Sequence, residues 1–545
     1  LFFMNNTILN IPFPVNEPVY SYAPGSKERK LLKEALTALK AERKDIPQYI
    51  GTEKVFSGNK ISIHPPHELS CTLGEYHLGN ETHVHAAINA ALAAKEKWEF
   101  LPWEQKAAIF LKAADLVAGP YRYKINAATM LCQSKNVYQA EIDAACELAD
   151  FLRYNVYYAN EIYKIQPGSA PGVWNRLDYR PLEGFIYALT PFNFTAIAGN
   201  LPTSCALMGN TVVWKPADAQ IYSAALFMEI LLEAGLPSGV INLIYGDGPK
   251  AGEIIFSHPD FAGIHFTGST GVFKTIWKNI AQNIDNYKSY PRIVGETGGK
   301  DFVIVHESGD DQVAAANIIR GAFEFQGQKC SAASRVYIPA SKWENIWKLM
   351  EAELKTLKMG PTEDFSNFIN AVIDERAYNK ITGYIEKVKQ TPKNKIIFGG
   401  GYDKKTGYFI EPTVVLTEDP HSLTMEEEIF GPVLTIYIYK ETFEEILELA
   451  DKTSPYALTG AVIATDRYAQ DLAGRKLRHA AGNFYVNDKP TGAIVGQQPF
   501  GGGRMSGTND KSGSMLNLLR WVSPRTIKET ALSPKDYRYP FLEKD

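Results

Sequence analysis

The spacing of apolar residues along the chain changes near residue 184. Before that point, apolar positions recur every three or four residues, which is typical of helices with one buried face. After it, short apolar runs alternate with helical stretches. The pattern predicts helices over 27–44, 86–100, 105–118, 140–164 and 223–234, and strands over 185–189, 211–214, 240–244 and 263–266. Apolar runs joined by helices predict a parallel sheet that is covered on both faces.

A second unit of the same kind begins near residue 300. Its predicted elements are strands over 302–305, 336–338, 433–439 and 458–464, and a helix over 311–325. Two α/β units that meet near residue 300 are therefore expected. The Pro-containing, polar stretches at 166–181 and at the carboxyl end fit neither core, and we expect them to form strands that reach a partner subunit.

Composition and charge narrow the classes of function. The 545 residues include 57 Lys and Arg against 61 Asp and Glu, a net charge of −4 without long blocks of one sign. Nucleic-acid binding needs a basic face, so this partner is not expected. The uncharged stretch 184–214 is interrupted by Pro and Asn, which argues against a membrane span.

The cysteines and the amino-terminal residues bear on the compartment. The five cysteines are scattered and form no CxxC pair, so neither a disulfide framework nor a zinc ribbon is expected. The first sixteen residues carry no Lys or Arg, and we expect no secretory or transit leader. The predicted location is the cytoplasm, or the mitochondrial matrix in a eukaryote.

Two residues suggest covalent catalysis. Cys330 follows a helical pattern and precedes a strand, and Glu296 stands beside Gly298 and Gly299 at another strand end. A thiol nucleophile with a carboxylate base is a known pairing for covalent chemistry. The alternative for Cys330 is a small buried core thiol.

Glycine-rich turns and histidines add weaker signals. The turns at 246–248 and 266–271 each follow a strand and precede a helix, so their N–H groups could hold a pyrophosphate, although ordinary turns read the same way. His77, His83 and His85 cluster beside a helix start but match no ligand spacing, and no metal is expected.

Several motifs together resemble the aldehyde dehydrogenase superfamily. In chain order these are the residues at 191–194, 214–216, 266–269, 296–300, 327–330, 428–432 and 499–502. The resemblance implies an α/β fold with a Rossmann-type NAD-binding domain, an α/β catalytic domain and a small β oligomerisation flap. We assign 1–165 and 182–295 to the first domain, 296–500 to the second, and 166–181 and 521–545 to the flap. Segments 140–145, 480–484 and 491–502 resemble the branch that oxidises L-glutamate γ-semialdehyde.

The resemblance also assigns roles to residues. Cys330 would attack the aldehyde, Asn193 would hold the oxyanion and Glu296 would activate water. The cofactor would be NAD. It would be held by Lys215 and Glu428 at the riboses, Gly268 and Ser269 at the pyrophosphate, and Phe430 at the nicotinamide.

The carboxylate of Asp218 favours NAD over NADP. A carboxylate accepts hydrogen bonds from ribose hydroxyls and repels a 2′-phosphate. Asp218 reads equally well as a helix N-cap, and the two roles are compatible.

The same branch implies a site for the amino-acid head of the substrate. Backbone N–H groups of Gly492 and Ala493, with the Ser331 hydroxyl, would bind the α-carboxylate, and Glu147 would face the α-ammonium. Phe194 and Phe500 would line the aliphatic part, or else pack in the core. Asp143, Glu147 and Asp150 share one helical face, and such stripes are usually solvated.

Two other functions remain open. The first is oxidation of another semialdehyde, such as succinic semialdehyde, by the same motifs. The second is a non-catalytic protein on the same scaffold, which the joint presence of Cys330, Glu296 and Asn193 opposes. The expected partners are a small aldehyde and further copies of the chain, as a homodimer or larger homo-oligomer.

Overall fold

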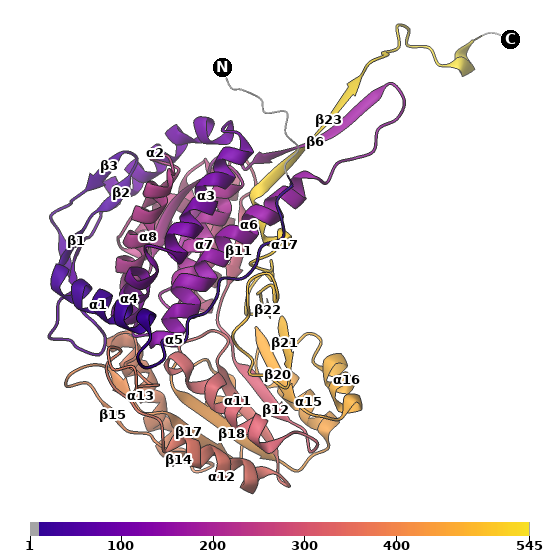
Figure 1. Cartoon of the computed structure of the whole chain (residues 1–545). Coiled ribbons are helices and arrows are strands. Elements are labelled where there is room, and N and C mark those ends of the chain that lie inside the picture. Colours follow the sequence, from indigo (N-terminus) through magenta and orange to yellow (C-terminus); the bar gives the residue numbers. More distant parts are fainter. Residues whose placement is uncertain (1–9, 544–545) are drawn as a thin grey trace.

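The computed structural model describes residues 10–543 and places two α/β units side by side, with a two-stranded ribbon that projects from the body (Figure 1). Residues 1–9 and 544–545, which belong to the predicted first domain and flap, lie outside the described residues. The first sheet has seven strands in the order β11 (Arg292–Glu296), β10 (Phe261–Thr267), β7 (Phe185–Thr190), β8 (Thr211–Pro216), β9 (Ile241–Leu243), β2 (Gln48–Ile50) and β3 (Glu53–Val55).

Helices bury both faces of this sheet. On β7, Phe185 and Tyr187 pack with one set of helices, whereas Ile186 and Ala188 belong to a core on the opposite face. Successive side chains of a strand point to opposite faces, so an uninterrupted apolar run needs cover on both. The first set is α2 (Glu81–Glu99), α9 (Gly248–Ser257) and α10 (Thr270–Gln282); the second includes α3 (Trp103–Ala118), α4 (Arg122–Gln133), α6 (Leu148–Tyr163), α7 (Thr195–Leu207) and α8 (Ile221–Ala234).

The prediction of a mostly helical amino-terminal portion was wrong for residues 44–77. After α1 (Lys27–Glu42), which Ser26 caps, the chain forms β2, β3 and a separate sheet of β1 (Lys44–Ile46), β5 (Gly74–His77) and β4 (Lys60–Ile63). These strands have three or four residues each, too few to show a period of two. β2 pairs antiparallel with β9 and β3, and so extends the edge of the parallel sheet.

The second sheet also has seven strands, and only its edge strand β14 is antiparallel to its neighbour. Its order is β14 (Asn394–Phe398), β17 (Thr413–Thr417), β18 (Val433–Tyr439), β13 (Ala333–Pro339), β12 (Asp301–Val305), β20 (Thr459–Ile463) and β21 (Asn483–Val486). One face packs against α11 (Asp311–Phe323) and α12 (Trp343–Leu354), the other against α15 (Phe443–Lys452) and α16 (Arg467–Lys476), while α13 (Glu375–Lys389) packs near β17. The parallel sheets confirm the predicted α/β class.

The predicted helix over 140–164 is not one regular helix. It comprises α5 (Val137–Ala140), a π-helical stretch η1 (Glu141–Glu147) and α6. The wide turn brings Asp143 to no exposure and Asp150 to 3%. Asp143 and Asp150 are therefore buried and Glu147 is half-buried, which corrects the interpretation of this face as solvated.

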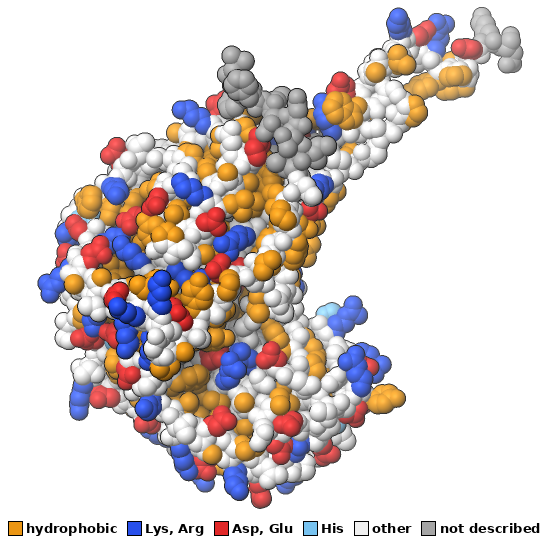
Figure 2. Space-filling model, in the orientation of Figure 1, with side chains coloured by type: hydrophobic (Ala, Val, Ile, Leu, Met, Phe, Trp, Pro, Cys, Tyr) orange, Lys and Arg blue, Asp and Glu red, His pale blue; other side chains and the backbone are white. Residues whose placement is uncertain are grey.

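The ribbon pairs two segments that are far apart in sequence. β6 (Val173–Pro181) runs antiparallel to β23 (Val522–Thr530), with Val173 opposite Thr530 and Val522 opposite Pro181. Figure 2 shows apolar side chains on this projecting arm, and charges of both signs interspersed over the visible body. Trp174 and Leu532 are 60% and 83% exposed.

Short elements complete residues 10–543: η2 (Asp218–Gln220), η3 (Ile284–Asn286), η4 (Glu324–Gly327), β15 (Tyr402–Asp403), β16 (Phe409–Ile410), α14 (Leu423–Glu426), β19 (Tyr456–Ala457), β22 (Gly503–Arg504), α17 (Met515–Leu518), η5 (Leu519–Trp521) and η6 (Pro540–Leu542). Among the helices of this described part, none is long and apolar enough to span a bilayer.

Candidate active site

The candidate catalytic residues collect where the carboxyl ends of the first sheet meet the amino ends of the second. Glu296 is the last residue of β11 and Asn193 follows β7, whereas Cys330 precedes β13. Ligands of open α/β sheets bind at the carboxyl ends of strands, where loops supply the side chains. Hydrogen bonds cross this junction, among them one from Asn193 Nδ2 to the Gln328 carbonyl (3.1 Å) and one from the Gly502 N–H to Glu296 Oε2 (2.8 Å).

A strained turn carries Cys330 into the junction. Phe325 and Gln326 have φ of 52° and 54°, and Gly327 has φ of 64°. A Cβ on Gly327 would lie 2.3 Å from the carbonyl oxygen of Gly431, so this position requires glycine. Strained backbone of this kind persists only where the surroundings hold it, and it concentrates at functional sites.

The surroundings of Cys330 disfavour its thiolate form. Burial raises its pKa, and the negative charges of Asp301, Glu428 and Glu296 raise it further. The thiolate is the nucleophilic form of cysteine. Attack on a carbonyl therefore needs a proton acceptor close to the sulfur.

Glu296 has the chemistry of such an acceptor. Burial raises the pKa of its carboxyl well above the usual range, although the Gly502 N–H and the Lys511 ammonium act in the opposite direction. A carboxylate whose pKa is raised is, in its ionised form, a stronger general base than an ordinary one. Its Oε1 lies against Gly501, where a Cβ would be 3.0 Å away.

Asn193 is held in a fixed orientation. The side chain is buried, and one of its two amide N–H groups is engaged by the Gln328 carbonyl, two residues before Cys330. The other N–H group makes no hydrogen bond within the described residues. A preoriented donor of this kind stabilises an oxyanion because it does not reorganise during the reaction.

Lys215 and Asp218 form one end of a possible dinucleotide site. Lys215 lies near the end of β8 and is buried; burial lowers the pKa of its ammonium, while the charges of Asp218 and Asp247 counteract that effect. Asp218 is the first residue of η2 and makes no capping hydrogen bond. The interpretation of Asp218 as a helix N-cap was therefore wrong, and its carboxylate is left for other partners.

Ser269 and Gly268 stand where a pyrophosphate would meet a helix. Ser269 caps α10, its hydroxyl accepting from the Val272 N–H at 3.4 Å, and a Cβ on Gly271 would meet only open space. The N-terminus of a 13-residue helix attracts anions through its free N–H groups. The Gly268 N–H is directed back to the Glu296 carbonyl (3.2 Å).

Glu428 and Phe430 lie across the junction from Ser269. The Gly299 N–H donates to Glu428 Oε1 (2.9 Å), and a Cβ on Gly298 would lie 2.5 Å from both carboxylate oxygens. Phe430 has φ of 62° and packs edge-to-face on Phe192 at 5.9 Å. Buried carboxylate oxygens that can accept from hydroxyls, a helix N-terminus and a buried lysine form a donor and acceptor set that fits a dinucleotide.

The Ser331 hydroxyl connects the cysteine turn to a second loop. It lies 2.8 Å from the Thr491 hydroxyl, and both residues are buried. Gly492 follows with φ of 95°, a conformation that favours glycine. The loop of residues 491–498 therefore stands beside the nucleophile, with Gly492 exposed and Ala493 half-buried.

The ring of Phe194 lies against the ammonium group of Lys135. The Lys135 ammonium lies 3.9 Å from the centre of its ring, a favourable cation–π distance. Phe500 forms an isolated backbone bridge with Ser512. No hydrogen bond in residues 10–543 joins Phe500 or Ala493 to Cys330.

Glu147 ends the π-helical stretch and faces charged neighbours. Burial raises the pKa of its carboxyl to about 8, with Asp143 adding to the rise and Lys135 and Lys329 opposing it. Lys329, whose charge acts on Glu147, precedes Cys330 in the chain. A cationic ligand beside this carboxyl would favour its ionised form and lower its pKa.

A buried ion pair organises this region and was missed by the sequence analysis. Lys135 Nζ donates to Asp143 Oδ2 (2.7 Å), and both side chains have no exposure. The carboxylate of Asp143 also accepts from the N–H groups of Thr195 and Ala196, which fixes the turn that carries Asn193. The acidic stripe was the available signal, but it was interpreted as solvated.

Of the three histidines singled out in the sequence, His77 and His83 have structural contacts, and His85 is exposed. His77 accepts from the Gly58 N–H, and His83 completes the cap of α2 with Asn80. A different group, His67, Glu68 and Glu363, brings potential ligand atoms within 4.8 Å of one another. The Lys40 ammonium, however, already pairs with both of these carboxylates.

Comparisons with known proteins agree with this geometry. Residues 56–527 match the model of the aldehyde dehydrogenase family. The chain is 52% identical over 539 residues to a mitochondrial Δ1-pyrroline-5-carboxylate dehydrogenase of Dictyostelium discoideum, covering 98% of this chain and 96% of that protein. It is 46% identical over 530 residues to the human mitochondrial protein of that name, covering 97% and 94%. The crystal structure of the Mycobacterium tuberculosis Δ-pyrroline-5-carboxylate dehydrogenase bound with NAD superposes with a TM-score of 0.96, 52% identity, and coverage of 99% of this chain and 100% of that chain.

Proposed function

Since the chain belongs to the aldehyde dehydrogenase family, we infer that it oxidises L-glutamate γ-semialdehyde to L-glutamate with NAD. This aldehyde is the open-chain form of Δ1-pyrroline-5-carboxylate, the substrate for which the relatives are named, and the reaction belongs to proline catabolism. The observation that carries this conclusion is similarity over nearly the whole chain, at 47–52% identity, to several proteins with that name. The other semialdehydes and the non-catalytic reading lack comparable support.

The reaction begins with attack of Cys330 on the aldehyde carbon. The thiol proton leaves toward Glu296 or water as the C–S bond forms, and the carbonyl oxygen becomes an oxyanion. Asn193 and the Cys330 backbone N–H donate to that oxygen. When bound, NAD accepts the hydride from the carbon, which leaves a thioester on Cys330.

Hydrolysis of the thioester completes the cycle. Glu296 first releases to solvent any proton that it took from the thiol. It then accepts a proton from water, the hydroxide adds to the thioester carbon, and the C–S bond breaks. Glutamate leaves, and the sulfur of Cys330 regains a proton. The raised pKa of the Glu296 carboxyl supports this role, because a carboxylate with a raised pKa is a stronger base than an ordinary one.

We propose further that NAD is held by the set Lys215, Asp218, Gly268, Ser269, Glu428 and Phe430. Lys215, Asp218 and Glu428 serve the ribose hydroxyls, Gly268 and Ser269 the pyrophosphate, and Phe430 the nicotinamide. Support comes from the orientation of Glu428 by the Gly299 N–H and from the free carboxylate of Asp218. A 2′-phosphate would meet that carboxylate, which favours NAD over NADP.

The amino-acid head is proposed to bind between the 491–498 loop and Glu147. The N–H groups of Gly492 and Ala493 with the Ser331 hydroxyl take the α-carboxylate, and Glu147 takes the α-ammonium. Phe194 and Phe500 line the methylene groups. The hydrogen bond between Ser331 and Thr491 supports the first part.

The domain boundaries, the oligomeric state and the compartment are also proposals. We propose that 1–165 with 182–295 forms the NAD-binding domain, that 296–500 forms the catalytic domain, and that 166–181 and 521–545 associate with a second copy in a homodimer or larger homo-oligomer. The isolated, exposed ribbon supports association, because unpaired strand edges favour partners. Several relatives are named as mitochondrial, and we propose the mitochondrial matrix in a eukaryote or otherwise the cytoplasm.

One assay tests the substrate. Formation of NADH is followed with glutamate semialdehyde, succinic semialdehyde and propanal. Succinic semialdehyde lacks the α-ammonium, so we expect its kcat/KM to be about 10 to 100 times lower, since a charge-assisted hydrogen bond contributes roughly 1.5–3 kcal/mol. Equal or better turnover of succinic semialdehyde would refute the substrate, and no NADH with any aldehyde would refute catalysis.

A further inference from the structure

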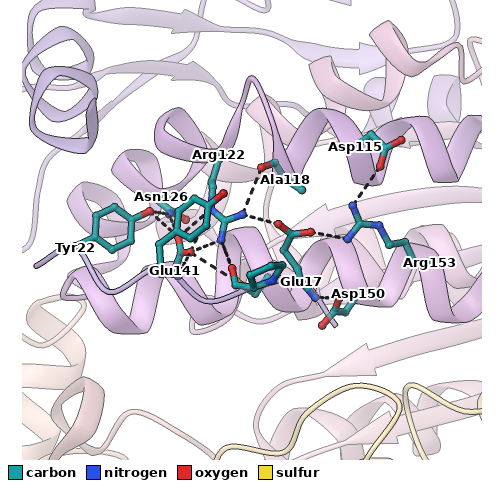
Figure 3. Close-up of polar contacts among 12 residues, drawn as sticks. Glu17, Tyr22, Asp115, Ala118, Arg122, Asn126, Glu141, Asp150 and Arg153 are labelled. Atoms are coloured by element: carbon teal, nitrogen blue, oxygen red, sulfur yellow. Dashed lines mark hydrogen bonds and ion pairs between the residues drawn. The ribbon is translucent and has the colours of Figure 1, made fainter. Parts of the chain in front are cut away.

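An extended amino-terminal segment, residues 10–22, runs along the helices that carry Glu147 (Figure 1). It has neither helix nor strand, yet ion pairs hold it to the body. Figure 3 shows Glu17 between two arginines: its carboxylate accepts from Arg122 (2.7 Å) and Arg153 (2.6 Å). The Tyr22 hydroxyl donates to Glu141 (2.6 Å). A segment tied in this way holds its side chains in fixed places.

One side chain of this segment joins two parts of the proposed substrate site. Asn16 Nδ2 donates to Asp150 Oδ2 and to the Val495 carbonyl, each at 2.8 Å. Its Oδ1 accepts from Gln497 Nε2 at 2.9 Å. Asp150 belongs to α6, whereas Val495 and Gln497 belong to the 491–498 loop. A single amide group therefore bridges helix and loop.

The helix side of this bridge is rigid. The Glu17 N–H donates to Asp150 Oδ1 (2.8 Å), so the two oxygens of the Asp150 carboxylate are occupied by neighbouring residues of the segment. Asp150 is 3% exposed. It follows Glu147 by three residues, and side chains at this spacing lie on the same helix face.

The loop side is packed on the same helix. Gly496 has φ of 81°, and a Cβ there would lie 2.1 Å from the Tyr154 ring. Tyr154 is one turn beyond Asp150 on α6, and its hydroxyl donates to the Pro14 carbonyl (3.0 Å). Loop, helix and segment thus meet around Asn16. Gly496, where the loop packs on the helix, follows Ala493 by three residues.

We propose that Asn16 is a positioning residue that sets the distance between Glu147 and the Gly492–Ala493 N–H groups, and thereby the selectivity for aldehydes with an α-amino-acid head. The proposal rests on the proposed function of these groups. Asn16 touches no reacting atom, and its effect is transmitted by Asp150 on one side and Val495 on the other. Placement errors of an ångström are costly in a site that must hold two charges at once.

The test compares Asn16→Ala, Gln497→Ala and the control Glu17→Gln. Glu17 anchors the same segment but has no hydrogen bond to the loop among the described contacts. For Asn16→Ala we expect KM for glutamate semialdehyde to rise about tenfold with kcat within about threefold, and kcat/KM for propanal to stay within about twofold. Gln497→Ala should show the same split more weakly.

Amide hydrogen exchange of the 491–498 loop supplies a readout that does not depend on the substrate. Exchange should be faster in Asn16→Ala and Gln497→Ala than in wild type and Glu17→Gln. Equal losses for both aldehydes, unchanged loop exchange, or the same selectivity change in Glu17→Gln would overturn the role of Asn16. If wild type fails to oxidise glutamate semialdehyde, the proposed function fails, and loop exchange still decides whether Asn16 holds the loop. Gln497 is exposed, so its variant keeps the test possible if Asn16→Ala does not fold.

Discussion

Glu147→Gln should stabilise the free enzyme while it impairs recognition of the α-ammonium. Burial raises the pKa of this carboxyl from 4.5 to about 8, so the folded state binds its proton more tightly than the unfolded state does. Between these two pH values the unfolded chain releases the proton first. The stability of wild type therefore falls as pH rises through this range.

The size of this effect follows from the pKa. A rise from 4.5 to about 8 corresponds to at most about 5 kcal/mol at pH 8, at roughly 1.36 kcal/mol for each pKa unit. Relaxation and water penetration reduce such costs, and we expect about 1–3 kcal/mol. Glutamine carries no ionisable proton, so the variant should escape this loss.

Thermal unfolding of the unliganded enzyme at pH 6 and pH 8 measures the stability term. The Tm of Glu147→Gln should exceed that of wild type, and the difference should be larger at pH 8. In steady-state assays the variant should raise KM for glutamate semialdehyde about tenfold or more, and leave propanal nearly unchanged. A less stable variant, or equal effects on the two aldehydes, would show that Glu147 is a structural residue.

Three other predictions concern the nucleophile, the carboxylate loop and the ribbon. Cys330→Ala should abolish NADH formation, while calorimetry shows nearly unchanged NAD binding. Glu296→Gln should give a burst of about one NADH per site followed by slow turnover. Loss of the burst would assign Glu296 to an earlier step. Gly492→Val should reduce kcat/KM for glutamate semialdehyde far more than for propanal, because Gly492 has φ of 95°. Ala493→Ser should change kcat/KM for glutamate semialdehyde by less than about fivefold. Equal losses for the two aldehydes in Gly492→Val would contradict the carboxylate anchor. Removal of the residues after Trp521 should weaken the oligomer in light scattering, and a wild type that is already an active monomer would disprove that role.

Much of the fold could be predicted from the sequence because buried parallel strands are short and uniformly apolar. The predicted strand over 433–439 coincides with β18, and the predicted helix over 311–325 differs from α11 only at its last two residues. There the strained turn at Phe325 interrupts the helix. Periodicity reports which face of an element is buried, and this information is local.

The interactions that were not predicted join residues whose sequence neighbours give no sign of the partner. Asn16 and Val495 are 479 residues apart, and nothing in either segment indicates the other. Lys135 and Asp143 are closer in sequence, but a buried ion pair has the same local pattern as a solvated one. The motif residues Cys330, Glu296 and Asn193 could be named because a known family uses them, not because their spacing reveals a junction between two sheets.

The π-helical stretch η1 sets the rotational register of the helix that follows it. A π-turn accommodates one more residue than an α-helical turn, so α6 is rotated relative to the helix that a regular continuation from α5 would give. Closure of Glu141–Glu147 into regular α-helical turns, with no residue removed, would turn the following face by roughly the angle of one residue, about 100°. Asp150 would then leave Asn16, and Tyr154 would leave Gly496. The π-helical widening of this stretch is therefore what aligns α6 with the amino-terminal segment and the 491–498 loop.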